Sequence, residues 1–372
     1  MDILIAETAS RIKPLIDSAS LSLKKSAHDQ INVAILFEKG RIPVSQIYPF
    51  EFYKNDFKKL GIKFKKYNID EFEASDKFSI GHPDFIIFQP WFDKGDSRMV
   101  QMLNRLKEAH PKAKILFFDC YAPTDLRFAE SVDPFIDYYV KKHVFRDRSQ
   151  YNKATAGDTS LVEYYNRLYN LSEEPLTLFK VPDSFLKKLI VGPTFFTSEP
   201  MMLPMSSSKR PFSLKKSINV HARLTTKGTP WYSAMRQSAI KSCHAADSII
   251  TDEFTGLKKY ARELRSSRIC FSPFGYGEIC WRDYEAIFSG ALLIKPDSSH
   301  VETYPDVFKD KKTYVACKWD FSDLDEKIDY YLSHEDERLD IVNNAYKLLH
   351  RYINGTEFIE LFAGLFGRTV KK

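Results

Sequence analysis

Short apolar runs alternate along the first half of the chain with segments in which apolar residues recur every three or four positions. The apolar runs predict β-strands at 31–38, 62–69, 83–92, 114–119 and 135–140. The segments 50–61 and 97–110 have helical periodicity, and Gly61 and Pro111 stand where those helices should end. This alternation is typical of a parallel sheet covered by helices.

A second α/β unit follows with the same pattern. We expect strands at 217–224, 247–251, 269–273 and 291–296, and helices at 231–246, 256–267, 279–289, 323–333 and 336–352. Segment 195–212 contains Pro, Ser and Met without a period and predicts a linker or mobile loop. Segment 145–190 is less regular, and 1–29 is expected to be a helical extension. The predicted domains are therefore 1–190 and 191–345, with a helix in 346–372.

The composition is that of a soluble globular protein, with 44% hydrophobic and 28% charged residues. A net charge of +6, with both signs interspersed, suits phosphate-bearing ligands or an anionic membrane surface, and it is too weak to indicate nucleic acid. The 5 cysteines form no C-x-x-C pair, which disfavours a zinc site and a disulfide framework.

The start of the chain lacks the features of a secretory signal, because Asp2 and Glu7 interrupt its apolar residues. No apolar stretch is long enough for a transmembrane helix. We therefore expect a cytoplasmic protein. No G-x-G-x-x-G motif follows the first predicted strand, which disfavours a dinucleotide-dependent dehydrogenase.

The most informative segment is 269–305, which predicts strand, glycine-containing loop, helix and strand. Gly275 and Gly277 flank Tyr276 in a loop that a ligand can approach closely. The helix that follows presents unpaired N–H groups to this loop, as an anion such as a diphosphate requires. Arg282 and Glu285 lie three residues apart on it. A carboxylate can hold a ribose diol and a guanidinium can hold phosphate, although the spacing also fits a surface ion pair.

The sequence WRDYEAIFSGALLI in this segment resembles the R-x-x-E-A-I-x-x-G motif of exostosin-like glycosyltransferases. It also resembles the E-A-x-x-x-G-x-P-V-I element of the wider GT-B glycosyltransferases. The resemblance implies a GT-B fold, in which two Rossmann-like domains face each other across a cleft. It makes Glu285 the ribose ligand of a nucleotide sugar, Arg282 the family's arginine and Gly290 the turn before the next strand.

The retaining GT-B pattern has a further glutamate eight residues before Glu285, where this chain has Gly277 followed by Glu278. This departure favours an inverting, metal-independent enzyme. A retaining GT-B enzyme, and a non-catalytic nucleotide- or sugar-binding protein of the same shape, remain alternatives. Tyr276, Gly277 and Glu278 complete this part of the predicted donor site.

A second strand–loop–helix junction, 219–232, places His221 and Arg223 on one face of a strand and Lys227 in the following loop. As the diphosphate leaves, its growing charge requires cations, so we expect Arg223 and Lys227 to bind it with help from His221. The alternative is a solvated basic loop.

An inverting enzyme also needs a base for the acceptor hydroxyl, which the first domain should supply. Candidates near strand ends are Asp119, Asp125 and His143, with Asp125 favoured because it lies in the loop. A capping aspartate and a surface histidine are the alternatives. The stretch D-Y-Y-V-K-K-H around His143 resembles one in bacterial sugar transferases of capsule and lipopolysaccharide assembly.

The predicted function is transfer of a sugar from a nucleotide-sugar donor to a glycan or glycolipid acceptor in polysaccharide or lipopolysaccharide biosynthesis. No metal and no nucleic-acid partner are expected. The C-terminal stretch FIELFAGLFGRTVKK could contact a membrane peripherally through its apolar residues and basic end, or could cross back to the first domain.

Overall fold

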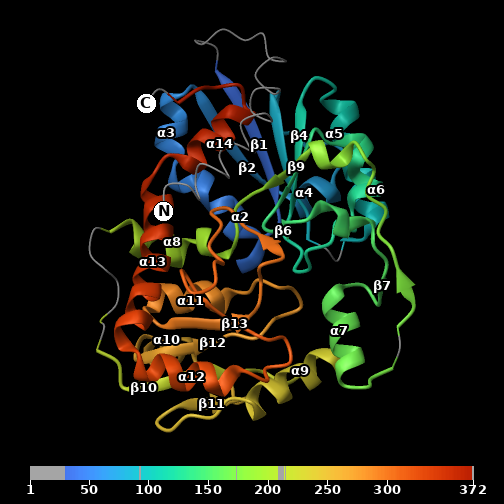
Figure 1. Cartoon of the computed structure of the whole chain (residues 1–372). Coiled ribbons are helices and arrows are strands. Elements are labelled where there is room, and N and C mark those ends of the chain that lie inside the picture. The colour runs from blue at the N-terminus through green and yellow to red at the C-terminus, as the bar shows by residue number, and fades with distance from the viewer. Residues whose placement is uncertain (1–29, 92–93, 173, 208–212, 214, 371–372) are drawn as a thin grey trace.

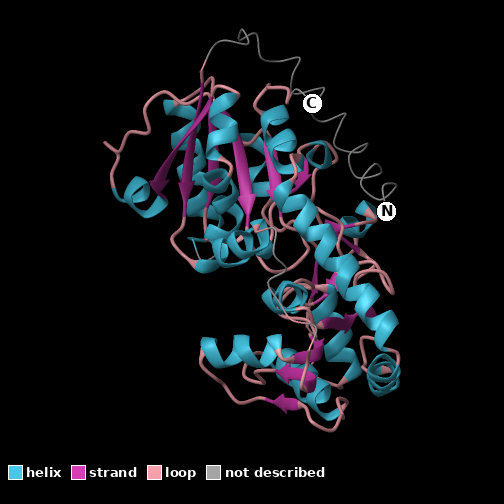
Figure 2. Ribbon diagram, turned by 90° about the vertical axis from the view of Figure 1, so that its left-hand side faces the viewer, coloured by secondary structure: helices cyan, strands magenta, loops and turns pink. Residues whose placement is uncertain are grey.

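The computed structural model describes residues 30–91, 94–172, 174–207, 213 and 215–370. The predicted extension 1–29 lies outside these residues. The described chain forms two α/β domains, each built on its own parallel sheet (Figure 1). Figure 2 shows the two sheets in separate lobes, one above the other. The predicted class, two Rossmann-like domains facing each other, is thereby confirmed.

The first sheet has six parallel strands in the order β2-β1-β3-β4-β5-β9. Its strands are β1 (Ile31–Phe37), β2 (Ile62–Asn68), β3 (Phe85–Gln89), β4 (Lys114–Asp119), β5 (Tyr138–Lys141) and β9 (Leu189–Val191). The packed helices include α2 (Arg41–Phe52), α3 (Lys54–Lys59), α4 (Ile69–Ala74) and α5 (Asp96–Ala109). Every residue of β3 is buried, which explains why this strand is a continuous apolar run in the sequence.

The second sheet has five parallel strands in the order β11-β10-β12-β13-β15. They are β10 (Ile218–Arg223), β11 (Ile249–Thr251), β12 (Ser267–Phe271), β13 (Leu292–Pro296) and β15 (Val315–Cys317). The helices of this domain are α9 (Pro230–Lys241), α10 (Leu257–Arg265), α11 (Trp281–Ser289), α12 (Leu324–Ser333) and α13 (Glu335–Asn354). Gly290 ends α11 in a left-handed conformation, with φ 67°, as its position in the motif predicts.

Loops from the carboxyl ends of both sheets meet between the domains. The short strands β6 (Val144–Phe145), after β5, and β14 (Val301–Glu302), after β13, pair antiparallel and join one domain to the other. Two ion pairs flank them, Arg146 with Asp306 and Arg148 with Glu302, each at 3.0 Å. Because ligands bind outside the carboxyl ends of parallel strands, this interface is where a site is expected.

The last helix, α14 (Glu357–Leu365), packs against the first domain. The rings of Phe358 and Phe362 lie 5.2 and 4.9 Å from that of Phe50, and Arg368 Nε donates to the Leu60 carbonyl at 3.1 Å. The apolar residues of α14 are buried there, so of the two alternatives for this stretch the structure shows the helix that crosses back to the first domain. Within the described residues, no helix is both long and apolar enough to cross a bilayer.

Two further expectations are corrected. Segment 195–212 is not a linker as far as it is described, because it forms the 3₁₀ turn η5 (Phe195–Thr197) and the helix α8 (Glu199–Ser206). Three methionines of α8 are buried, so packing rather than periodicity stabilises it. The irregular stretch 145–190 contains the helix α7 (Ser160–Leu168), whose N-cap Thr159 accepts a hydrogen bond from the Val162 amide.

The two domains also touch at Gly277, in the loop before α11. A Cβ added to Gly277 would overlap the carbonyl oxygen of Ala122 in the first domain. At this position the glycine permits two backbones to approach each other, whereas the motif had suggested approach of a ligand.

Replacement of Gly277 by alanine should therefore force the domains apart. We expect Gly277→Ala to lower the free energy of unfolding by about 1–3 kcal/mol, as overpacking does. Thermal unfolding and small-angle scattering would detect the loss of stability and the opening. A Cβ at Gly275 would meet no atom closer than 3.7 Å, so Gly275→Ala is the matched control. Equal behaviour of the two variants would contradict the close contact.

Candidate functional site

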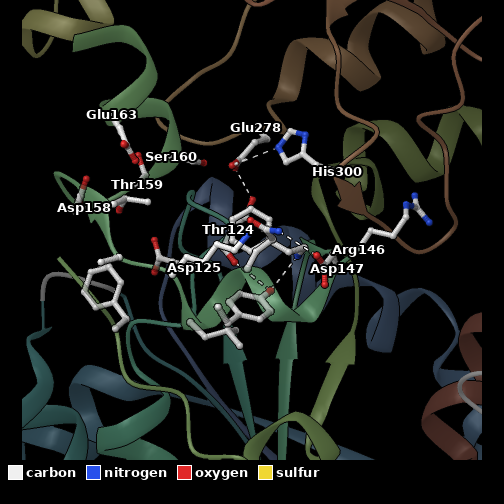
Figure 3. A pocket seen from close by; sticks show the side chains of 18 of the residues that line it. Thr124, Asp125, Arg146, Asp147, Asp158, Thr159, Ser160, Glu163, Glu278 and His300 are labelled. Carbon is white, nitrogen blue, oxygen red and sulfur yellow. Dashed lines mark hydrogen bonds and ion pairs between the residues drawn. The ribbon is translucent and has the colours of Figure 1, made fainter. Parts of the chain in front are cut away.

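A pocket of about 760 Å³ lies between the domains, at the carboxyl ends of their strands. The first domain lines it with residues of 124–126, 145–163 and 177–181. The second domain contributes Glu278, Asp297, Ser299, His300 and Trp319. Figure 3 shows Glu278 and His300 opposite Thr124 and Asp125, from elements far apart in the sequence.

Glu278 connects the two domains at this pocket. Thr124 Oγ1 donates a hydrogen bond to Glu278 Oε2 at 2.5 Å, while His143 Nε2 lies 3.8 Å from Oε2 and His300 Nε2 lies 3.9 Å from Oε1. Burial raises the pKa of the Glu278 carboxyl, but the neighbouring histidines outweigh this, and the net shift is downward. Glu278 is therefore a carboxylate at neutral pH, in a site where it is only 2% exposed.

His143 has no exposed surface and reaches the pocket only through Glu278. Burial lowers the pKa of His143 to about 4, so its imidazole is neutral at pH 7. Within the described residues, neither ring nitrogen makes a hydrogen bond. The sequence placed His143 and Glu278 in different roles, and the structure brings them together.

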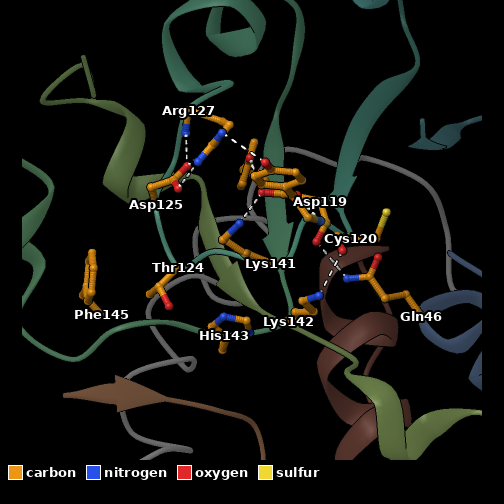
Figure 4. Close-up of polar contacts among 12 residues, drawn as sticks. Gln46, Asp119, Cys120, Thr124, Asp125, Arg127, Lys141, Lys142, His143 and Phe145 are labelled. Carbon is orange, nitrogen blue, oxygen red and sulfur yellow. Dashed lines mark hydrogen bonds and ion pairs between the residues drawn. The ribbon is translucent and has the colours of Figure 1, made fainter. Parts of the chain in front are cut away.

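The two candidate aspartates have different environments (Figure 4). Asp125 lines the pocket, and both of its oxygens accept hydrogen bonds from Arg127, at 2.8 and 2.7 Å. Asp119, at the end of β4, is buried and accepts from the Tyr121 amide, the Tyr139 hydroxyl and Lys141 Nζ. These contacts use both Asp119 oxygens to hold the neighbouring strand β5 and the loop after β4. Of the two aspartates, only Asp125 lines the pocket.

A second pocket, of about 450 Å³, lies on the other side of the loop that precedes α11. Four of the predicted donor residues line it: Arg223, Tyr276, Arg282 and Glu285. Arg41 and Arg236 add further positive charge, against the carboxylates of Asp252, Glu253 and Glu285. Four arginines thus face three carboxylates in the lining, and Glu263 behind the lining pairs with one of them, Arg223. Guanidinium groups are suited to binding a diphosphate.

Glu285 pairs with Arg41 of the first domain rather than with Arg282. Arg41 Nη2 lies 3.0 Å from Oε1, and the Tyr260 hydroxyl donates to Oε2 at 2.9 Å. Arg282 Nη2 instead donates to the Arg223 carbonyl at 2.6 Å. The alternative of a simple surface ion pair between Arg282 and Glu285 is therefore not what the structure shows.

Of the predicted residues around the second junction, Arg223 lines the second pocket, whereas His221 and Lys227 do not. Arg223 makes two hydrogen bonds to Glu263, at 2.6 and 3.0 Å, and the buried His221 lies 3.5 Å from the same carboxylate. Burial lowers the pKa of His221 to about 4, so the imidazole is neutral at pH 7 and adds no positive charge beside Arg223. Lys227 extends from an exposed loop.

Sequence reasoning missed three residues that line these pockets, Arg41, Thr124 and Tyr260. It also missed Glu263, which pairs with Arg223. Arg41 had a usable signal, because Gly40 and Arg41 form the junction between the first strand and its helix. The partners of Glu278 and Glu285 come from the other domain or another helix, and no local pattern identifies them.

Most of the second domain is similar to a known protein family. Residues 219–358 match a family described as glycosyl transferase-like. This match covers both predicted junctions, with Arg223 near its start and Glu285 near its centre. No curated protein matches the chain.

Several solved structures are similar at low identity. They include an alpha-glucosyltransferase in complex with UDP-glucose and abasic DNA (11% identity, 91% of this chain and 98% of that one, TM-score 0.47). The OtsA apo structure (10%, 90% and 99%, 0.48) and a glycosyltransferase from Rickettsia africae (9%, 91% and 99%, 0.47) are others. Because the identities and TM-scores are this low, the assignment of the fold rests on the two parallel sheets of this chain. In the described part of the chain, no three His, Cys, Asp or Glu side chains group as they would around a metal ion.

The buried His143 predicts a loss of stability in acid. Its pKa is about 4 when folded and about 6.5 when unfolded, so the unfolded state takes up the proton first. The contribution is complete above pH 6.5 and is lost as the pH falls toward 4, by about 3 kcal/mol. Denaturant unfolding of the wild type and of His143→Gln across this range should show a shallower slope for the variant. Parallel slopes would contradict a neutral, buried histidine.

Proposed function

We propose that the protein is a glycosyltransferase that moves a sugar from a nucleoside-diphosphate sugar to a glycan acceptor. The observation that carries this proposal is the convergence of Arg223, Arg282 and Glu285 in one cationic pocket within the domain that matches the glycosyl transferase-like family. The neighbouring pocket between the domains then holds the acceptor.

In the donor pocket, the Glu285 carboxylate accepts hydrogen bonds from the ribose hydroxyls. Arg223 and Arg282, with Lys227 from the adjacent loop, neutralise the diphosphate as it leaves. Phe254 lines the same pocket with 93% of its surface exposed, which suits stacking on the base of the nucleotide. Tyr276 is held by its stacking on Tyr232, with ring centroids 4.6 Å apart.

At the acceptor, we propose inversion, with Asp125 as the base that takes the proton of the attacking hydroxyl. Its pocket position supports this role, while its pairing with Arg127 holds the carboxylate in place. A retaining reaction is the second candidate, because Glu278 lines the pocket although it is displaced by one residue from the family pattern. The anomer of the released sugar, read by NMR, separates the two.

Other parts of the proposal rest on the sequence. We propose that the enzyme works without a metal, in the cytoplasm, on glycans of polysaccharide or lipopolysaccharide biosynthesis, and does not act on nucleic acid. The exostosin-like motif supports a glycan substrate, and the moderate net charge argues against nucleic acid.

A thermal-shift screen with nucleoside diphosphates tests the donor site. One of UDP, GDP, ADP, CDP or TDP should stabilise the protein, by about 2.7 kcal/mol at a hundred times its Kd. Lys227→Ala should weaken that nucleotide about tenfold because it removes a charge-assisted contact, and it should leave the melting temperature without ligand unchanged because Lys227 is exposed.

The matched control is Lys77→Ala, an exposed lysine of the first domain, which should bind as the wild type does. No response to any nucleotide would reject the donor site. Binding of a nucleotide and its sugar conjugates without hydrolysis or transfer would favour a non-catalytic binding protein.

A further inference from the structure

The pocket between the domains is acidic, in contrast to the donor pocket. Six carboxylates line it, from Asp125, Asp147, Asp158, Glu163, Glu278 and Asp297. Two permanently charged cations, Arg146 and Lys153, line the same pocket. An enzyme that only had to hold a diphosphate would have no use for this excess of negative charge.

Neighbouring cations compensate only part of this charge. Arg127 pairs with Asp125 and Asp158, and Arg167 pairs with Glu163 at 2.9 Å. Arg146 is itself engaged, because its guanidinium lies 3.0 Å from Asp306.

Two carboxylates face the pocket with neutral partners. Among the described residues, Asp147 accepts hydrogen bonds from Ser149 and Gln150, and Asp297 accepts them from Ser299 and the Tyr314 hydroxyl. Hydrogen bonds from Gln150 and Ser149 also lower the pKa of Asp147, so it remains ionised. Among the described residues, neither carboxylate forms an ion pair with a side-chain cation, although the charge of Lys153 acts on Asp147 from farther away.

The rest of the wall is aromatic and suits a sugar ring. Phe145, Tyr151, Phe179 and Trp319 line the pocket, and Trp319 is fixed by a hydrogen bond from its Nε1 to the Asp297 carbonyl at 2.9 Å. Apolar walls with a few fixed polar groups, at about 760 Å³, are what a small-molecule site offers.

We infer that this pocket takes an acceptor sugar without an anionic group, and that a sugar with a protonated amine binds best. The inference rests on the proposed function and specifies its acceptor. The carboxylates of the pocket repel a phosphate or carboxylate on the sugar, because these charges have the same sign. They attract an ammonium group, so a sugar with a protonated amine binds more tightly. The inference restricts any polysaccharide or lipopolysaccharide acceptor to one whose acceptor sugar is neutral or cationic.

Three probes with the same ring test this inference: glucosamine, glucose and glucose 6-phosphate. Ligand-observed NMR at about pH 6.5, where the amine is protonated, and at low salt should rank them in that order of affinity, with glucose 6-phosphate at least about fivefold weaker than glucosamine. The differences should shrink in high salt, which screens charges. Binding of none of the three, or equal binding of glucose 6-phosphate and glucosamine, would overturn the inference.

The double variant Asp147→Asn with Asp297→Asn removes the two unpaired charges, and asparagine keeps the turn hydrogen bonds. It should weaken glucosamine and tighten glucose 6-phosphate, each by about threefold. Glu71→Gln with Asp336→Asn, two exposed carboxylates outside the pocket, makes the same change in net charge and should leave the ranking unchanged. An unchanged ranking in the pocket variant would also overturn the inference. The nucleotide response of the same samples reports separately on the proposed function.

Discussion

The site depends on the contact between the loop that precedes α11 and the loop that follows β4. At this contact the backbone of Gly277 lies against Ala122, and Glu278 accepts a hydrogen bond from Thr124. The contact fixes the distance between the domains and separates their interface into two pockets. Without a glycine at this position, the backbones could not approach closely enough for Thr124 to reach Glu278.

The two pockets on either side of this contact differ in charge. Arginines concentrate on one side, around Glu285, and uncompensated carboxylates concentrate on the other, around Glu278. In the proposed function, the first pocket attracts a diphosphate and the second repels it, which favours a donor with its phosphates on the cationic side. The two buried histidines, His143 and His221, lie next to carboxylates but are neutral, so they do not cancel the negative charge.

The sequence was sufficient for features that are encoded locally. Apolar runs identified the strands of both sheets except β9 and β15, and the motif pointed to Glu285, which lines a pocket. Periodicity failed where packing dominates, as in α8, whose helix contains Pro204 and is held by buried methionines. It also failed for pairs between domains, because nothing near Glu285 in the sequence indicates that Arg41, 244 residues away, is its partner.

The environment of each candidate base was likewise invisible in the sequence. Asp119 and Asp125 follow the same strand, yet one is buried against Lys141 and the other lines a pocket. Burial and partner charge decide which can take a proton, and both arise only when the loops after β4 and the strand β5 fold together.

The most direct test of this account is a crystal structure with the nucleoside diphosphate that binds best. The account predicts that the diphosphate lies among Arg223, Lys227 and Arg282, with the ribose hydroxyls on Glu285 and the sugar end directed past Gly277 toward Glu278. A nucleotide bound in the acidic pocket beside Asp125 and Asp147, or outside both pockets, would contradict it.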